Sequence, residues 1–143
     1  HPDRFAADGA AAQQRAMQWS VRVNEAYARL RDPLRRAAYL CELRGAPIEA
    51  ESNTAMPPAF LMQQMAWREA LDEAPDIATV ERLDADVRQV EAEQLATLQR
   101  LLDGDDGSGA GANAAAAAAQ VRALMFILRF RADLERRLDA ADA

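Results

Sequence analysis

Apolar residues recur at steps of three and four along stretches of this chain that contain neither proline nor glycine. One such stretch lies between Pro75 and Gly104 and carries Val80, Leu83, Val87, Val90, Leu98 and Leu101. This spacing places the apolar side chains on one side of an α-helix and so predicts a long amphipathic helix. No segment shows the alternation of apolar and polar residues that a half-buried strand requires. The chain is therefore predicted to be all-α.

Prolines and glycines mark where the helices should begin and end. Asp32 followed by Pro33 indicates a helix start, with a capping carboxylate and a proline in the first turn. Ala74-Pro75-Asp76 should end one helix and cap the next. Polar residues, proline or glycine dominate residues 46–58 and 103–113, which are predicted to be connections. Helices are expected at residues 10–31, 33–45, 59–73, 76–104 and 114–139.

The connections predict how these helices are arranged. The last three helices, joined by one tight turn and one flexible loop, are expected to form an antiparallel three-helix bundle. The two earlier helices meet at Asp32-Pro33 and should form a separate hairpin. The chain is thereby divided into a unit at residues 1–45 and a unit at residues 46–143.

Charge and composition exclude several classes of function. A net charge of −6 lacks the positive surface that sequence-independent phosphate binding requires, so no nucleic-acid partner is expected. One cysteine and one histidine cannot supply a disulfide, a four-cysteine zinc site or an iron–sulfur ligand set, so no cofactor is expected. Cys41, close in sequence to Leu34 and Ala37, is predicted to be a small buried hydrophobe.

Catalytic and membrane functions are not expected either. Nucleophilic chemistry needs reactive side chains gathered in one place, whereas the histidine is His1 and the cysteine lies inside a predicted helix. The chain has no glycine-rich phosphate loop, serine-centred elbow or two-histidine zinc motif. It also has no apolar run of membrane-spanning length and no leader, which predicts a soluble protein without enzyme activity.

The helix predicted at residues 59–73 has apolar residues on two sides. With about 100° per residue, the core-facing side carries Phe60, Trp67 and Leu71. The other side carries Leu61, Met62 and Met65, continued by Glu69 and Glu73. An apolar patch with an acidic extension, turned away from the core, is a candidate docking surface. The alternative is that Leu61 to Met65 pack under the 46–58 loop or against the first hairpin.

Several sequence segments together resemble one family. His1-Pro2-Asp3, followed by Asn24-Glu25-Ala26-Tyr27-Ala28-Arg29-Leu30-Arg31-Asp32-Pro33, is similar to the later part of a J-domain. Pro33 to Gly45 resembles the linker of the HscB-type co-chaperones of iron–sulfur cluster assembly. Pro58 to Glu73 and Val121 to Phe126 resemble that family's scaffold-binding helix and the matching segment of its last helix.

The resemblance implies a division of roles. Residues 1–45 would be J-domain helix III with a linking helix, J-helices I and II being absent, and residues 46–143 the scaffold-binding bundle. His1, Pro2 and Asp3 would bind a heat-shock ATPase chaperone of the HscA type and stimulate its hydrolysis. An iron–sulfur scaffold protein of the IscU type would bind the residues Leu61, Met62, Met65, Glu69, Glu73 and Phe126. The single cysteine and the abundance of arginine without lysine lead us to expect a bacterial cytoplasm.

Three further expectations follow. The chain begins at the His-Pro-Asp loop, so it should bind scaffold but stimulate hydrolysis weakly. Phe126 lies about 150° from the mean direction of the neighbouring core residues, so it should face a partner. Ala66 stands where the family commonly has an acidic residue, so part of the polar rim is expected to be absent, with an effect on affinity or salt dependence.

Two other functions stay open at this point. One is a helical adaptor unrelated to chaperones, whose first three residues match by accident. The other is an assembly bundle, in which the Leu61 to Met65 patch is buried in a homodimer. The residues that precede His1 in the natural protein would discriminate the first, and sedimentation would address the second.

Overall fold

The computed structural model describes residues 9, 10, 14, 17, 32–103 and 110–142. Within this part of the chain the fold is all-α, as predicted. The helices are a segment at residues 32–43, α2 at Pro58–Glu73, α3 at Ile77–Asp103 and α4 at Ala110–Asp142. His1, Pro2 and Asp3, most of the helix predicted at residues 10–31, and residues 104–109 lie outside the described residues.

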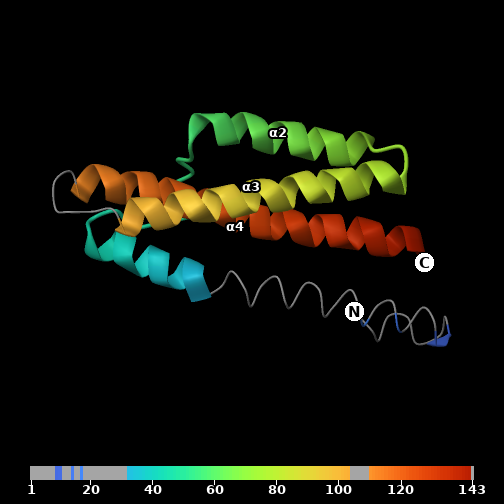
Figure 1. Cartoon of the computed structure of the whole chain (residues 1–143), viewed down its shortest axis with the longest axis horizontal. Helices are drawn as coiled ribbons and strands as arrows, with labels where there is room; N and C mark the ends of the chain where they lie inside the picture. The colour runs from blue at the N-terminus through green and yellow to red at the C-terminus, as the bar shows by residue number, and fades with distance from the viewer. Residues whose placement is uncertain (1–8, 11–13, 15–16, 18–31, 104–109, 143) are drawn as a thin grey trace.

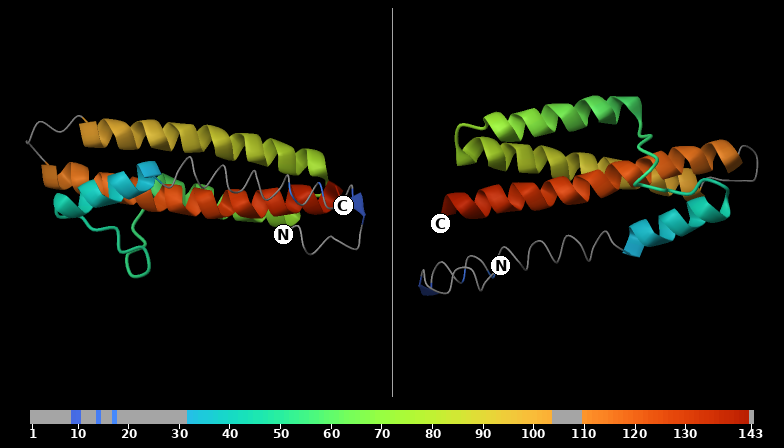
Figure 2. Two further views of the ribbon diagram at one scale, coloured as in Figure 1. Left: turned by 90° about the horizontal axis from the view of Figure 1, so that it is seen from below. Right: turned by 180° about the vertical axis from the view of Figure 1, so that it is seen from behind.

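The three long helices run in alternating directions, as the antiparallel bundle required (Figure 1). α3 and α4 approach each other closely, because small residues lie in the buried part of α4, including Ala117 and Ala118. α2 lies beside this pair at a greater distance, with large aromatic side chains filling the space. The helix at residues 32–43, which we call the linking helix, lies alongside the end of the bundle where α3 ends (Figures 1 and 2).

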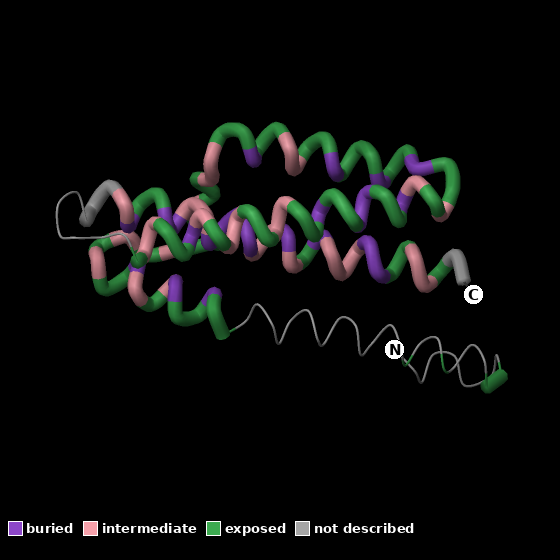
Figure 3. The backbone as a smooth tube through the Cα atoms, in the orientation of Figure 1, coloured by how far each residue is buried: buried purple, intermediate pink, exposed green. Residues whose placement is uncertain are grey.

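One continuous core joins the linking helix to the bundle. Leu34, Ala37 and Cys41 are buried in the same apolar cluster as the inner residues of α2, α3 and α4. Cys41 is completely buried, as predicted, and this burial raises the pKa of its thiol. Figure 3 shows the buried positions turned toward the interior of the bundle. The division of the chain into units at residues 1–45 and 46–143 remains a prediction. The linking helix belongs to the first of these units, but it packs against residues of the second.

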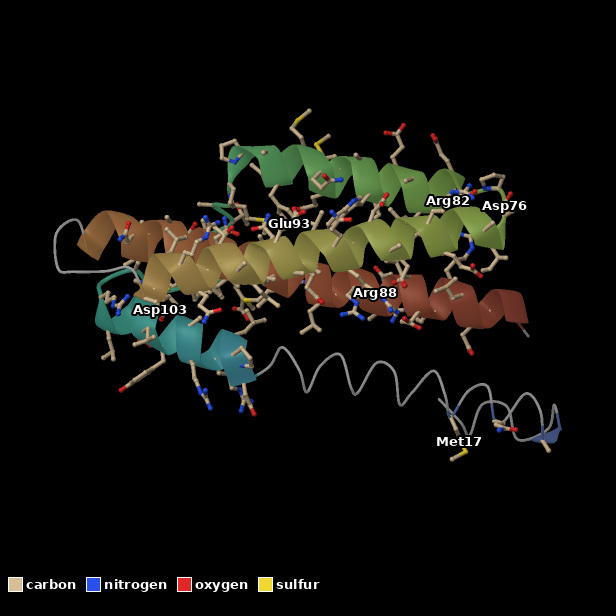
Figure 4. The ribbon with its side chains drawn as sticks, in the orientation of Figure 1. Met17, Asp76, Arg82, Arg88, Glu93 and Asp103 are labelled. Atoms are coloured by element: carbon tan, nitrogen blue, oxygen red, sulfur yellow. The ribbon has the colours of Figure 1, made fainter. Side chains whose placement is uncertain are left out.

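Local sequence signals account for two helix ends. Gly45 has a positive φ of 87°, and the amide of Ala46 donates to the carbonyl of Cys41 at 2.7 Å, which closes the end of the linking helix. Asp76 caps α3, because its Oδ1 accepts hydrogen bonds from the amide of Thr79 at 2.8 Å and from its hydroxyl at 2.6 Å. Figure 4 shows Asp76 near Arg82, whose guanidinium donates to the hydroxyl of Thr79 at 3.2 Å.

The predicted bounds of α4 were wrong at both ends. The helix begins at Ala110 rather than Ala114, so residues 110–113 do not belong to the connection. Alanines before the run are strong helix formers, and the complete burial of Ala114 anchors this turn in the core. The helix continues to Asp142 because no proline or glycine follows Asp139.

Buried carboxylates between α3 and α4 are paired with arginines. Asp84 and Glu135 are both buried, and Arg88 lies at 3.0 Å from the first and 3.7 Å from the second (Figure 4). A buried carboxylate without a cation would be strongly destabilising, so these contacts help to fix the register of the two helices. α2 is placed on this rigid pair.

Candidate docking surface on α2 and α4

α2 separates its apolar residues into two sides, as the sequence predicted. Phe60, Trp67 and Leu71 are 2%, 3% and 6% exposed and form its inner side. The outer side carries three large apolar residues with high exposure: Leu61 at 43%, Met62 at 70% and Met65 at 68%. We call these three residues the apolar row; side chains bearing sulfur project outward from α2 in Figure 4. Neither the 46–58 loop nor the linking helix buries the row. The alternative of packing against the rest of the first hairpin falls mostly on residues outside the description.

Four aromatic rings hold α2 against α4. Phe60 meets Trp67 and Phe126 edge to face, with ring centroids 5.8 and 5.9 Å apart. Phe130 stacks on Trp67 and on Phe126, each at 5.8 Å. Such pairs contribute about 0.5–1.5 kcal/mol each beyond the area they bury. The apolar row is therefore presented by a helix with a rigid base.

Phe126 lies at the edge of the core, a position that the wheel did not predict, and its contact with a partner stays a prediction. It is half-buried and packs on Phe60 and Phe130, and it leaves only part of its ring accessible. The prediction took the mean direction of the apolar residues of α4 as the centre of its buried side. Residues 121–124 are all buried, however, so α4 is covered around most of its circumference at this level.

A groove of about 460 Å³ connects Phe126 to the outer side of α2. Four predicted site residues line it: Met65, Glu69, Glu73 and Phe126. The structure thus brings these four together. Leu61 and Met62 do not line the groove and lie on the exposed outer side of α2, toward the beginning of the helix.

Sequence reasoning missed the other residues of the groove, which are Gln64, Arg68 and Asp72. Arg68 forms an ion pair with Asp133 at 3.0 Å, and its guanidinium lies 4.9 Å from the ring centroid of Phe130. Asp133 also pairs with Arg136, and the groove itself carries three carboxylates from α2 against the one guanidinium of Arg68. A signal for Asp72 was present, because the wheel places it at about 120°, between Leu61 and Met65.

Two kinds of site are absent among the described residues, a metal centre and a membrane-spanning helix. Among the described residues no group of three or more histidine, cysteine, aspartate or glutamate side chains is placed to hold a metal ion. No helix in the described ranges combines the length and apolar character needed to cross a membrane. The predicted chaperone-binding residues His1, Pro2 and Asp3 fall outside the description.

Comparison with known proteins identifies the family. A family model described as the HSCB C-terminal oligomerisation domain matches residues 56–135, which span α2, α3 and most of α4. The co-chaperone protein HscB homolog of Cupriavidus taiwanensis is 54% identical over 142 residues, covering 97% of this chain and 77% of that protein. The chain belongs to the HscB co-chaperone family.

Other HscB relatives agree with this assignment. The co-chaperone protein HscB homolog of Burkholderia multivorans is 52% identical and matches 94% of this chain and 74% of its own length. That of Paraburkholderia phymatum is 50% identical, with 99% and 79% covered. These relatives are named as co-chaperones, and the absence of enzyme activity stays a prediction. The region matched by the HscB family model contains the whole apolar row and the groove.

Proposed function

We propose that this protein is a co-chaperone of iron–sulfur cluster assembly whose bundle binds a scaffold protein of the IscU type. The J-domain part, at residues 1–45, would recruit a heat-shock ATPase chaperone of the HscA type and stimulate its ATPase in the cytoplasm. The scaffold would be delivered to that chaperone because both partners are held by one chain, which raises their effective concentration at each other.

The observation that carries the proposal is the exposed apolar row on a helix whose other side is fully packed. Met62 and Met65 are more than two-thirds exposed, although each could bury apolar area in a contact. Methionine adapts to the shape of a partner surface because its side chain is unbranched and polarisable. The row continues into a groove with Phe126 at its side, and the cores of protein interfaces are enriched in aromatic residues and methionine.

Electrostatics supports a peripheral role for the acidic residues. Glu69, Asp72 and Glu73 are exposed and lie beside the groove. Exposed charges at the edge of an interface change the rate of association and its salt dependence more than they change the final affinity. Ala66 is uncharged, so the acidic edge of the docking surface consists of Glu69, Asp72 and Glu73.

A specific observation also favours a second candidate, which is self-association through the same row. The matching family model is described as an oligomerisation domain, and an exposed apolar patch can be covered by a second copy. Sedimentation of the protein alone discriminates the two functions. A monomeric protein that binds scaffold through the apolar row supports the docking function. A stable homodimer that dissociates when the apolar row is changed supports self-association instead.

The direct test of the proposal is a calorimetric titration with the purified apo scaffold protein of the same organism. A variant with Leu61, Met62 and Met65 changed to Ser should keep the helical signal of the parent and lose binding. Binding that persists in this variant at the affinity of the parent contradicts the proposal.

The chaperone interaction is tested separately. The His1→Gln variant should bind scaffold as the parent does, and whatever stimulation of the chaperone ATPase the parent gives should be lost. Stimulation that equals that of the parent would contradict the role proposed for His1, Pro2 and Asp3.

A further inference from the structure

Arg122 is a buried arginine that holds a loop rather than a carboxylate. It lies on α4 and is 5% exposed. Its Nε donates to the carbonyl of Ile48 at 2.9 Å, Nη1 to that of Ala55 at 2.9 Å and Nη2 to that of Pro47 at 3.2 Å. Three nitrogens of one planar group therefore bind three backbone carbonyls, a geometry for which a guanidinium is suited and an ammonium group is not.

These carbonyls belong to both ends of the loop that connects the linking helix to α2. Pro47 and Ile48 lie at its beginning and Ala55 near its end, so Arg122 draws the two ends together. Between them the amides of Ser52 and Asn53 donate to the carbonyl of Glu49. The loop is visible at residues 46–57 on the side of the bundle in Figure 2. The two ends of the loop lie close together, as in compact Ω-type surface loops, and Arg122 donates hydrogen bonds to both ends.

The loop also determines where α2 begins. Ala55 lies just before Pro57, whose carbonyl accepts the amides of Phe60 and Leu61 at 2.9 and 3.2 Å. The residue at the N-cap is Pro57, which makes no side-chain capping bond, so no cap fixes this end of the helix from within. The carbonyl held by Arg122 is therefore the polar anchor closest to the first turn of α2.

Arg122 lies one helical turn before Phe126 on α4. The same part of α4 thus holds the loop that leads to Leu61 and Met62 and supplies the aromatic ring beside the groove. We propose that Arg122 is a positioning residue for docking, which keeps the first turns of α2 in register with Phe126. This inference rests on the proposed function, because it concerns how the two parts of the scaffold-binding surface are held relative to each other.

The other end of α2 provides a matched comparison. Arg137, also on α4, donates to the carbonyl of Ala74 at 3.2 Å and to that of Leu71 at 3.5 Å. Arg137 thereby binds the C-terminal end of α2, which carries Glu73, whereas Leu61 lies near the N-terminal end of the same helix. A change at Arg137 should disturb that end and leave the apolar row in place.

The test measures scaffold affinity for Arg122→Lys and Arg137→Lys, each alone and in the backgrounds Leu61→Ala and Glu73→Ala. Lysine keeps the charge and much of the length but cannot bind three carbonyls in one plane. Arg122→Lys should weaken scaffold binding by about fivefold or more. This fold-loss of affinity should be smaller in the Leu61→Ala background and unchanged in the Glu73→Ala background. Arg137→Lys should show no such coupling to Leu61.

Helical content and thermal unfolding of each variant are measured first, and affinities refer to the folded protein. If Arg122→Lys fails to fold, Arg122→Gln, which retains two amide N–H donors, replaces it in the same cycle. Unchanged affinity, or an equal cost in the Leu61→Ala and Glu73→Ala backgrounds, overturns the positioning role. Failure of the parent itself to bind scaffold would instead contradict the proposed function.

Discussion

Replacing Phe126 by Ala should reduce both the stability of the bundle and its affinity for scaffold. Truncating a fully buried phenylalanine costs about 3–5 kcal/mol, through lost burial and the cavity left behind. Phe126 is only half-buried, which reduces that cost, but it also loses its contacts with Phe60 and Phe130. We therefore expect a loss of about 1.5–3 kcal/mol in the free energy of unfolding.

Denaturant unfolding followed by circular dichroism measures this loss, and Met62→Ala is the control. Met62 is 70% exposed, so its truncation should change the free energy of unfolding by less than about 0.5 kcal/mol. A double-mutant cycle between Phe60 and Phe126 should give a coupling of about 0.5–1.5 kcal/mol. A change for Phe126→Ala as small as that for Met62→Ala, with no coupling to Phe60, would refute the aromatic arrangement described for α2 and α4.

Three further changes test other parts of the structure. Trp67→Ala should cost about 3–5 kcal/mol of stability in denaturant unfolding, because Trp67 is 3% exposed and supports two rings. Asp76→Ala should lower the melting temperature at neutral pH. Hydrogen bonds from Thr79 hold the pKa of Asp76 below its ordinary value, so this stabilisation is present above about pH 3.9 and is lost as the pH falls through the lowered pKa, where parent and variant should converge. Changing Glu69 and Glu73 to Gln should slow scaffold association in stopped-flow measurements and flatten its salt dependence, unlike Glu81→Gln on exposed α3 surface.

The sequence was sufficient where one residue type and one spacing determine the structure. The inner and outer sides of α2 follow from the steps between Phe60, Trp67 and Leu71, because this helix meets the bundle on one side only. The start of α3 follows from Asp76, because a capping carboxylate needs only the neighbouring amide of Thr79.

The sequence was insufficient where several elements surround one helix. α4 is buried on nearly all sides around Val121 to Leu124, so a single mean direction does not show which neighbour Phe126 contacts. Arg122 gave no signal either, because its partners are carbonyls of a loop more than 60 positions away in the chain. Backbone acceptors exist at every residue, so the choice of carbonyl depends on tertiary structure alone.

The most direct test of the docking surface compares two exposed leucines. Leu61 lies in the apolar row at 43% exposure, and Leu43 lies on the linking helix at 63% exposure. Each is changed to Ala, and scaffold affinity and melting temperature are measured for both variants. We expect both variants to melt close to the parent, Leu61→Ala to lose about 1–3 kcal/mol of binding free energy, and Leu43→Ala to bind as the parent does. Equal affinities of the two variants would contradict the assignment of the docking surface to α2.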